Sequence, residues 1–151
     1  MKKESPRPGF DGSFIEDRRR ELAWLIIGGC RYHIDGEASS AMLADGVKAV
    51  AADDLVDDIP LKGAIRVGSR LVRRSRDGPI YLFAVDVPEN RLHPISTWET
   101  FLQYGFDLGK VMLVPDALLR PVPRGEELSS ALDRITRRGH SMYLPLLEVL
   151  N

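Results

Sequence analysis

The first regular pattern of apolar positions in the chain begins at Ser13. Ser13 and Glu16 have the spacing of a helix capping box, and the apolar residues that follow recur at helical intervals up to Gly28, a typical stop. The pattern therefore predicts a helix over 13–28. The alternative is a hairpin in which 22–27 turns at two glycines into 30–34.

Three later segments also have helical apolar spacing. The first is alanine-rich, the second begins with another capping box at Ser96, and the third has glutamates in its first turn and arginines in its last; they cover 37–52, 97–108 and 126–138. Between the last two, 111–114 has the composition of a short buried strand. The proline-rich 115–124 is expected to be an extended connector.

An alternating pattern predicts a β-hairpin in the middle of the chain. Over 65–74, apolar residues alternate with arginines, and 80–87 has its heavier apolar face at every second position. A loop with an odd number of residues around Asp77–Gly78 aligns the apolar faces. We therefore expect Arg66, Arg70 and Arg74 to lie together on the outer face of one strand.

The order of these elements predicts an α+β fold. We expect one small, mainly antiparallel sheet of roughly three to five strands, with about four helices packed against it. Residues 1–12, rich in proline, glycine and lysine, are expected to form a flexible N-terminal arm, and residues 13–151 a single α+β domain. We find no internal repeat in the sequence.

Composition limits the class of protein. The 151 residues are 44% hydrophobic and carry a net charge of −1, which excludes collagen-like and disordered chains. No apolar run approaches the length of a membrane span, and the N-terminus lacks the apolar stretch of a secretory signal. We expect a soluble, cytoplasmic protein without membrane contact.

The near-neutral net charge conceals two blocks of opposite sign. Residues 61–76 contain six basic and no acidic side chains: Lys62, Arg66, Arg70, Arg73, Arg74 and Arg76. Just before them lies the acidic cluster of Asp53, Asp54, Asp57 and Asp58. Blocks of opposite charge pair within a chain or between chains, so these arginines and aspartates are the candidate partner-binding residues.

Residues suited to catalysis or metal binding are few. His33 and Asp35 leave the same face of an extended segment, an arrangement that suits a general base or two metal ligands, and Cys30 is close in sequence. The chain contains no phosphate-binding loop, dinucleotide fingerprint or nucleophile elbow. We therefore assign no catalytic residue and expect neither a metal nor a cofactor.

The charge pattern favours a small non-catalytic interaction or regulatory protein, of the adaptor, immunity or inhibitor type. It is expected to bind a protein partner, or its own copy as a homo-oligomer, through the basic hairpin, the acidic cluster or both. A nucleic-acid-binding module that uses the arginine strand over 66–74 is the alternative. A small enzyme with a site near His33 and Asp35 is the second alternative.

Overall fold

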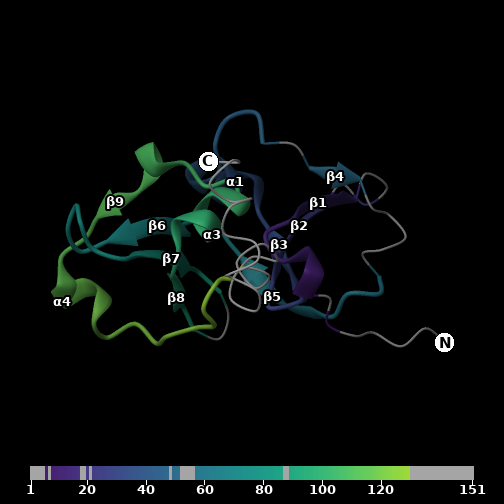
Figure 1. The fold of residues 1–151 in the computed structure, drawn as a ribbon. Helices are drawn as coiled ribbons and strands as arrows, with labels where there is room; N and C mark the ends of the chain where they lie inside the picture. The colour runs from purple at the N-terminus through teal and green to yellow at the C-terminus, as the bar shows by residue number, and fades with distance from the viewer. Residues whose placement is uncertain are drawn as a thin grey trace, which may run out of the picture.

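The computed structural model describes residues 6, 8–17, 20, 22–47, 49–51, 57–86 and 89–129. They form an α+β fold with two mixed sheets (Figure 1). The strands are β1 (Phe14–Asp17), β2 (Leu22–Ile27), β3 (Cys30–Ile34), β4 (Val50–Ala51), β5 (Leu61–Ile65), β6 (Arg70–Arg73), β7 (Ile80–Ala84), β8 (Arg91–Ile95) and β9 (Met112–Leu113). The helices are α1 (Gly36–Met42), α3 (Trp98–Gln103) and α4 (Asp116–Leu119), with 3-10 turns η1 (Pro8–Phe10) and η2 (Leu108–Lys110).

The first sheet has the strand order β4-β1-β2-β3-β5. Its central hairpin joins β2 to β3 through Gly28 and Gly29, whose φ angles of 60° and 79° favour glycine and suit a tight two-residue turn. The predicted helix over 13–28 is therefore wrong, and the hairpin alternative is correct. The last four residues of β2 are all buried, and a strand covered on both faces has no clear alternation.

The second sheet has the order β8-β7-β6-β9, and it corrects the predicted basic strand. Arg66 follows β5 of the first sheet, whereas Arg70 begins β6 of the second, so the expected row of arginines does not lie on one strand. Leu71 pairs with Leu82, and both are fully buried. With this register, β6 and β7 are joined by a loop with an even number of residues, 74–79, whereas an odd number was expected. The observed register is favoured because it buries both leucines.

The helices are shorter than the sequence pattern predicts. Among the described residues of the segment expected over 37–52, only those of α1 are helical. The segment expected over 97–108 contains α3, where Thr97 rather than Ser96 accepts the capping hydrogen bond from the Thr100 backbone N–H. The connector 115–124 contains α4, and the expected buried strand, β9, has two exposed side chains. Residues 126–129 are not helical; Leu128 bridges β8, and the rest of that predicted helix lies outside the described residues.

The two sheets repeat one strand order. In each, three consecutive antiparallel strands (β1–β3 and β6–β8) have a short parallel strand beside the first of them: β4 beside β1, and β9 beside β6. In the first sheet, β5 runs parallel to β3; in the second, residues 124 and 128 form parallel bridges to β8. The described residues therefore form two structural repeats, which the sequence analysis did not detect. We call residues 14–65 unit one and residues 71–128 unit two.

The pairing register defines which positions of the two units are equivalent. Ile15 pairs with Trp24 in unit one as Val72 pairs with Tyr81 in unit two. Further along, Leu61 pairs with Arg31 of β3 as Arg124 pairs with Leu92 of β8. Leu61 and Arg124 are 63 positions apart, as are Ile65 and Leu128, which pair with the ends of β3 and β8.

The units meet around an approximate twofold axis. The Ala44 backbone N–H donates to the Gly105 carbonyl (2.8 Å), and the Asp107 N–H donates to the Met42 carbonyl (2.9 Å). Met42 and Gly105 are 63 positions apart, as are Ala44 and Asp107, so twofold rotation exchanges the two bonds. The duplicated units therefore pack as the subunits of a symmetric dimer do.

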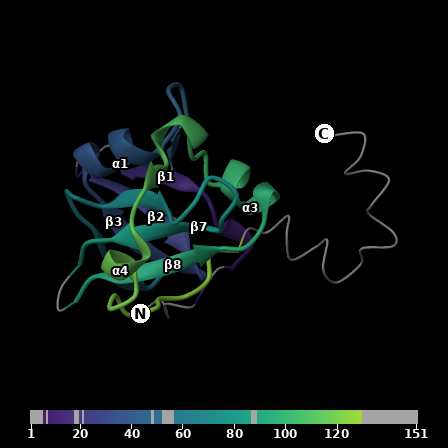
Figure 2. The same ribbon diagram turned by 90° about the vertical axis from the view of Figure 1, so that its left-hand side faces the viewer.

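The core lies between the sheets, which Figure 2 shows one in front of the other. Equivalent residues of the two units enter this shared cluster as pairs: Leu25 and Leu82, Ile34 and Ile95, Ile65 and Leu128. Each sheet also has an outer apolar cluster, built around Trp24 in unit one and Tyr81 in unit two. Apolar residues of each unit therefore cover both faces of its sheet.

Candidate functional site

Two arginines of unit two contact one carboxylate, and a third lies over the neighbouring tyrosine ring. Arg74 follows β6 and forms an ion pair with Asp116 at the start of α4 (Nε–Oδ1, 2.5 Å). Arg120, one helical turn later, donates its Nε–H to the other Asp116 oxygen (Oδ2, 3.1 Å). The Arg74 and Arg124 guanidinium carbons lie 5.6 and 4.7 Å from the centre of the Tyr81 ring. We call Arg74, Arg120, Arg124 and Asp116 the arginine cluster.

The arginine cluster carries excess positive charge. Hydrogen bonds from Arg120, together with the charges of Arg120, Arg74 and Arg124, hold the pKa of the Asp116 carboxyl below its usual value. Three guanidinium groups face one carboxylate, and the Arg120 side chain is 78% exposed. The cluster therefore retains guanidinium donors for an anionic group from outside.

The other predicted arginines lie elsewhere. Arg66 is exposed beside a hollow that Trp24 and His33 of unit one also line. Arg70 donates to the Ser69 carbonyl, Arg73 is half-buried, and Arg76 is exposed in the loop 74–79. Of the five arginines proposed from the sequence, only Arg74 belongs to the arginine cluster.

Asp57 of the predicted acidic cluster has a different partner from the one expected. Asp57 forms an ion pair with Arg20, in the turn between β1 and β2 (Oδ1–Nη2, 3.0 Å). Asp58 is half-buried in the same turn as Asp57. Asp53 and Asp54 lie outside the described residues. The contact of Asp57 is thus made within unit one and not with the basic block 61–76.

The two units differ in charge at equivalent corners. Asp17 of unit one is equivalent to Arg74, and Asp57 is equivalent to Arg120. Sequence reasoning missed Arg120, Arg124 and Asp116 because it did not align the halves. The signal was present: D-x-L-x-x-x-x-P occurs at 53–60 and again at 116–123, the same 63 positions apart.

His33 and Asp35 form the pair that the sequence suggested. Their side chains are one-third exposed, with His33 Nδ1 3.6 Å from Asp35 Oδ1. Asp35 also accepts a hydrogen bond from the Val67 backbone N–H. Cys30 points to the opposite face of β3, and burial raises the pKa of its thiol. Of these three residues, His33 and Asp35 therefore lie together as a partly exposed pair, and Cys30 does not join them.

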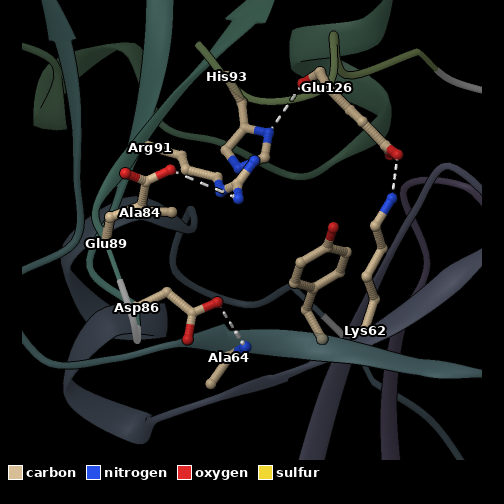
Figure 3. A pocket seen from close by; sticks show the side chains of 9 residues that line it. Lys62, Ala64, Ala84, Asp86, Glu89, Arg91, His93 and Glu126 are labelled. Carbon is tan, nitrogen blue, oxygen red and sulfur yellow. Dashed lines mark hydrogen bonds and ion pairs between the residues drawn. The ribbon is translucent and has the colours of Figure 1, made fainter. Parts of the chain in front are cut away.

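A pocket of about 240 Å³ is lined by residues of both units (Figure 3). Tyr32 and His93, which occupy equivalent positions in β3 and β8, pack edge to face there (ring centroids 6.4 Å apart). Ion pairs join Lys62 to Glu126 and Arg91 to Glu89. Asp86 accepts a hydrogen bond from the Ala64 backbone N–H (3.2 Å).

The two rings of the pocket are held neutral by their surroundings. His93 is 3% exposed, and burial lowers its pKa. Its Nδ1 lies 2.8 Å from the Glu126 carbonyl oxygen, which only accepts, so Nδ1 carries the proton and Nε2 is an acceptor. Burial raises the pKa of the Tyr32 hydroxyl far above its usual value.

Comparisons with known proteins give no match to a family model, to a curated protein or to a solved structure. Within the described ranges, no three His, Cys, Asp or Glu side chains are grouped as metal ligands. None of the helices in the described part of the chain has the length and apolar character that crossing a bilayer requires.

Proposed function

We propose that this protein is a non-catalytic binding module that holds an acidic segment of a protein partner on the arginine cluster. The observation that carries the proposal is the excess of positive charge around Asp116: Arg74 and Arg120 form ion pairs with its carboxylate, and Arg124 lies over the adjacent Tyr81 ring. A planar guanidinium binds a carboxylate through two parallel hydrogen bonds, so a glutamate or aspartate of the partner fits this surplus.

The arrangement of the arginines supports a pre-formed site. Asp116 bonds Arg74 and Arg120, while the Tyr81 ring lies against Arg74 and Arg124. Arginines held in this way lose less side-chain entropy on binding than freely rotating ones.

A nucleic acid is the less favoured ligand. Single-stranded binding relies on bases that stack on exposed aromatic rings. Tyr81 is only 8% exposed, because two guanidinium groups and its apolar neighbours cover it. The cluster therefore offers charge without a stacking surface, which suits a flexible acidic peptide better.

The test is the affinity of the full-length chain for a fluorescent Glu-rich peptide, compared with a single-stranded oligonucleotide of equal charge. Changing both Arg120→Glu and Arg124→Glu is expected to weaken peptide binding at least about tenfold, since each exposed contact contributes up to about 1 kcal/mol and reversal adds repulsion. Arg66→Glu is the matched control, because Arg66 is exposed but outside the arginine cluster.

Equal losses for the double variant and for Arg66→Glu would indicate a nonspecific charge effect and contradict the proposal. Tighter binding of the oligonucleotide, lost in the same double variant, would assign the arginine cluster to nucleic acid instead. Sedimentation of the chain without peptide reports whether a second copy supplies the acidic segment, as a homo-oligomer requires.

A further inference from the structure

The pocket between the units is a second candidate site, separate from the arginine cluster. The arginine cluster contacts the Tyr81 ring in the outer apolar cluster of unit two, whereas the pocket opens at the junction of β3 and β5 with β8. Its volume of about 240 Å³ is equivalent to roughly eight water molecules at about 30 Å³ each. That space suits one small ring compound.

The pocket places hydrogen-bond donors and acceptors around the same small space. His93 Nε2 is an acceptor, because Nδ1 carries the proton, and the neutral Tyr32 hydroxyl can donate and accept. Asp86 and Arg91 add a carboxylate and a guanidinium on the wall nearest the β7–β8 loop (Figure 3). A ligand in this space meets both kinds of group on several sides.

The charges of the pocket almost cancel. Lys62 is paired with Glu126 and Arg91 with Glu89, and Asp86 is the third carboxylate, which leaves a net charge of −1 with His93 neutral. A phosphate or carboxylate ligand needs surplus cations, which this lining does not supply. Neutral hydroxyl groups, which each donate and accept, match a lining of balanced charge.

Glycines fix the polar groups in place. An added Cβ at Gly125 would overlap the His93 ring, and one at Gly63 would lie 2.6 Å from Asp86 Oδ2. An added Cβ at Gly28, in the β2–β3 turn, would overlap the Glu126 carboxylate. Backbone therefore packs directly against three side chains of the lining, as expected for a pre-organised site.

From this geometry we propose that the pocket binds a neutral polyhydroxyl ligand the size of one sugar ring. Asp86 and Arg91 bind adjacent hydroxyls from the β7–β8 side, and His93 Nε2 accepts a hydrogen bond from a third hydroxyl. The small side chains of Ala64 and Ala84 leave room for the ring itself.

The experiment is saturation-transfer NMR on the full chain with glucose, galactose, N-acetylglucosamine and inositol, and with glycine and inorganic phosphate as charged comparisons. At least one polyol is expected to receive saturation and to be displaced by another. Asp86→Asn keeps the shape and removes the charge, and it should weaken that binding about tenfold, the usual loss for a hydrogen bond to a charged group. Ala64→Leu, which fills the space, should abolish it.

Asp77→Asn is the matched control. Asp77 is exposed in the loop 74–79, so this substitution removes the same charge outside the pocket. The control should bind as the unaltered protein does. Absence of saturation for all four polyols would overturn the proposal. So would polyol binding that survives both Asp86→Asn and Ala64→Leu, or preferential binding of glycine or phosphate. Peptide binding at the arginine cluster is measured separately and is expected to be unchanged in both pocket variants.

Discussion

Unit one and unit two place the same strands in the same order, yet their outer corners carry opposite charges. Leu25 and Leu82 are equivalent and both fully buried, whereas the equivalent exposed positions 57 and 120 hold Asp and Arg. Burial restricts a core position to apolar residues, while an exposed corner tolerates any charge. The duplicated core therefore maintains the fold, and unit two carries the arginine cluster.

The turns of the β2–β3 and β7–β8 hairpins also differ between the two units. β2 and β3 are joined by two glycines, whereas β7 and β8 are joined by 85–90, which supplies Asp86 and Glu89 to the pocket. The longer loop of unit two thus adds polar side chains that unit one has no room for. Binding groups placed on loops of a repeated scaffold are a common route to function.

The largest expected effect is in the shared core. Leu25→Ala and Leu82→Ala should each lower the free energy of unfolding by about 2–5 kcal/mol, because each leaves a cavity at an equivalent position. Denaturant unfolding of the two variants measures this. A large loss for one and none for the other would show that the units do not contribute alike to one core.

Two equivalent glycines should respond in opposite directions. Gly46 has φ +85°, so Gly46→Ala should lower the free energy of unfolding by about 1 kcal/mol. Gly109, its counterpart 63 positions later, is outside the left-handed region, and Gly109→Ala should be neutral or raise it by up to about 1 kcal/mol. Thermal unfolding of both variants measures these changes. A loss of stability in Gly109→Ala as large as that in Gly46→Ala would contradict the comparison.

His93 should make stability depend on pH, whereas its counterpart Tyr32 should not near neutrality. Because burial lowers the pKa of His93 in the folded state, the unfolded chain binds more protons below about pH 6.5. The free energy of unfolding should therefore have its full value above about pH 6.5 and decrease as the pH falls toward the pKa of His93 in the folded state. His93→Gln should flatten this slope, while the control His33→Gln should keep it; an unchanged slope in His93→Gln would exclude the histidine as its source.

The smallest effect should come from the acidic corner of unit one. Asp57 is 53% exposed and pairs with Arg20, so Asp57→Ala should change the free energy of unfolding by less than about 1 kcal/mol and leave peptide binding unaltered. A loss of peptide affinity comparable to that of the Arg120→Glu, Arg124→Glu variant would show that the two corners act together.

The sequence predicts the α+β class and the approximate position of α1 and α3, and it offers the hairpin at Gly28 only as the alternative to a helix; it does not predict the number of sheets. The missing information is long-range. A capping-box spacing at Ser13 is a local signal, and it is overridden because β2 is buried between β1 and β3.

The candidate site was harder to predict for the same reason. Arg74 was found from its neighbours in sequence, but Arg120 and Arg124 reach it only because α4 follows β9 back across the second sheet. The pocket joins β3, β5, β8 and the residues around Glu126, four separated segments. The pattern D-x-L-x-x-x-x-P, which recurs 63 positions apart, relates 53–60 to 116–123 but does not show which segments meet.

The most direct test of the account is a ¹⁵N–¹H spectrum of the arginine Nε–H groups, recorded as the Glu-rich peptide is added to the full chain. Binding at the arginine cluster predicts that the signals of Arg74, Arg120 and Arg124 shift together and saturate, while that of Arg66 stays in place. Shifts confined to Arg66 and Arg70, with the signals of the arginine cluster unchanged, would contradict it.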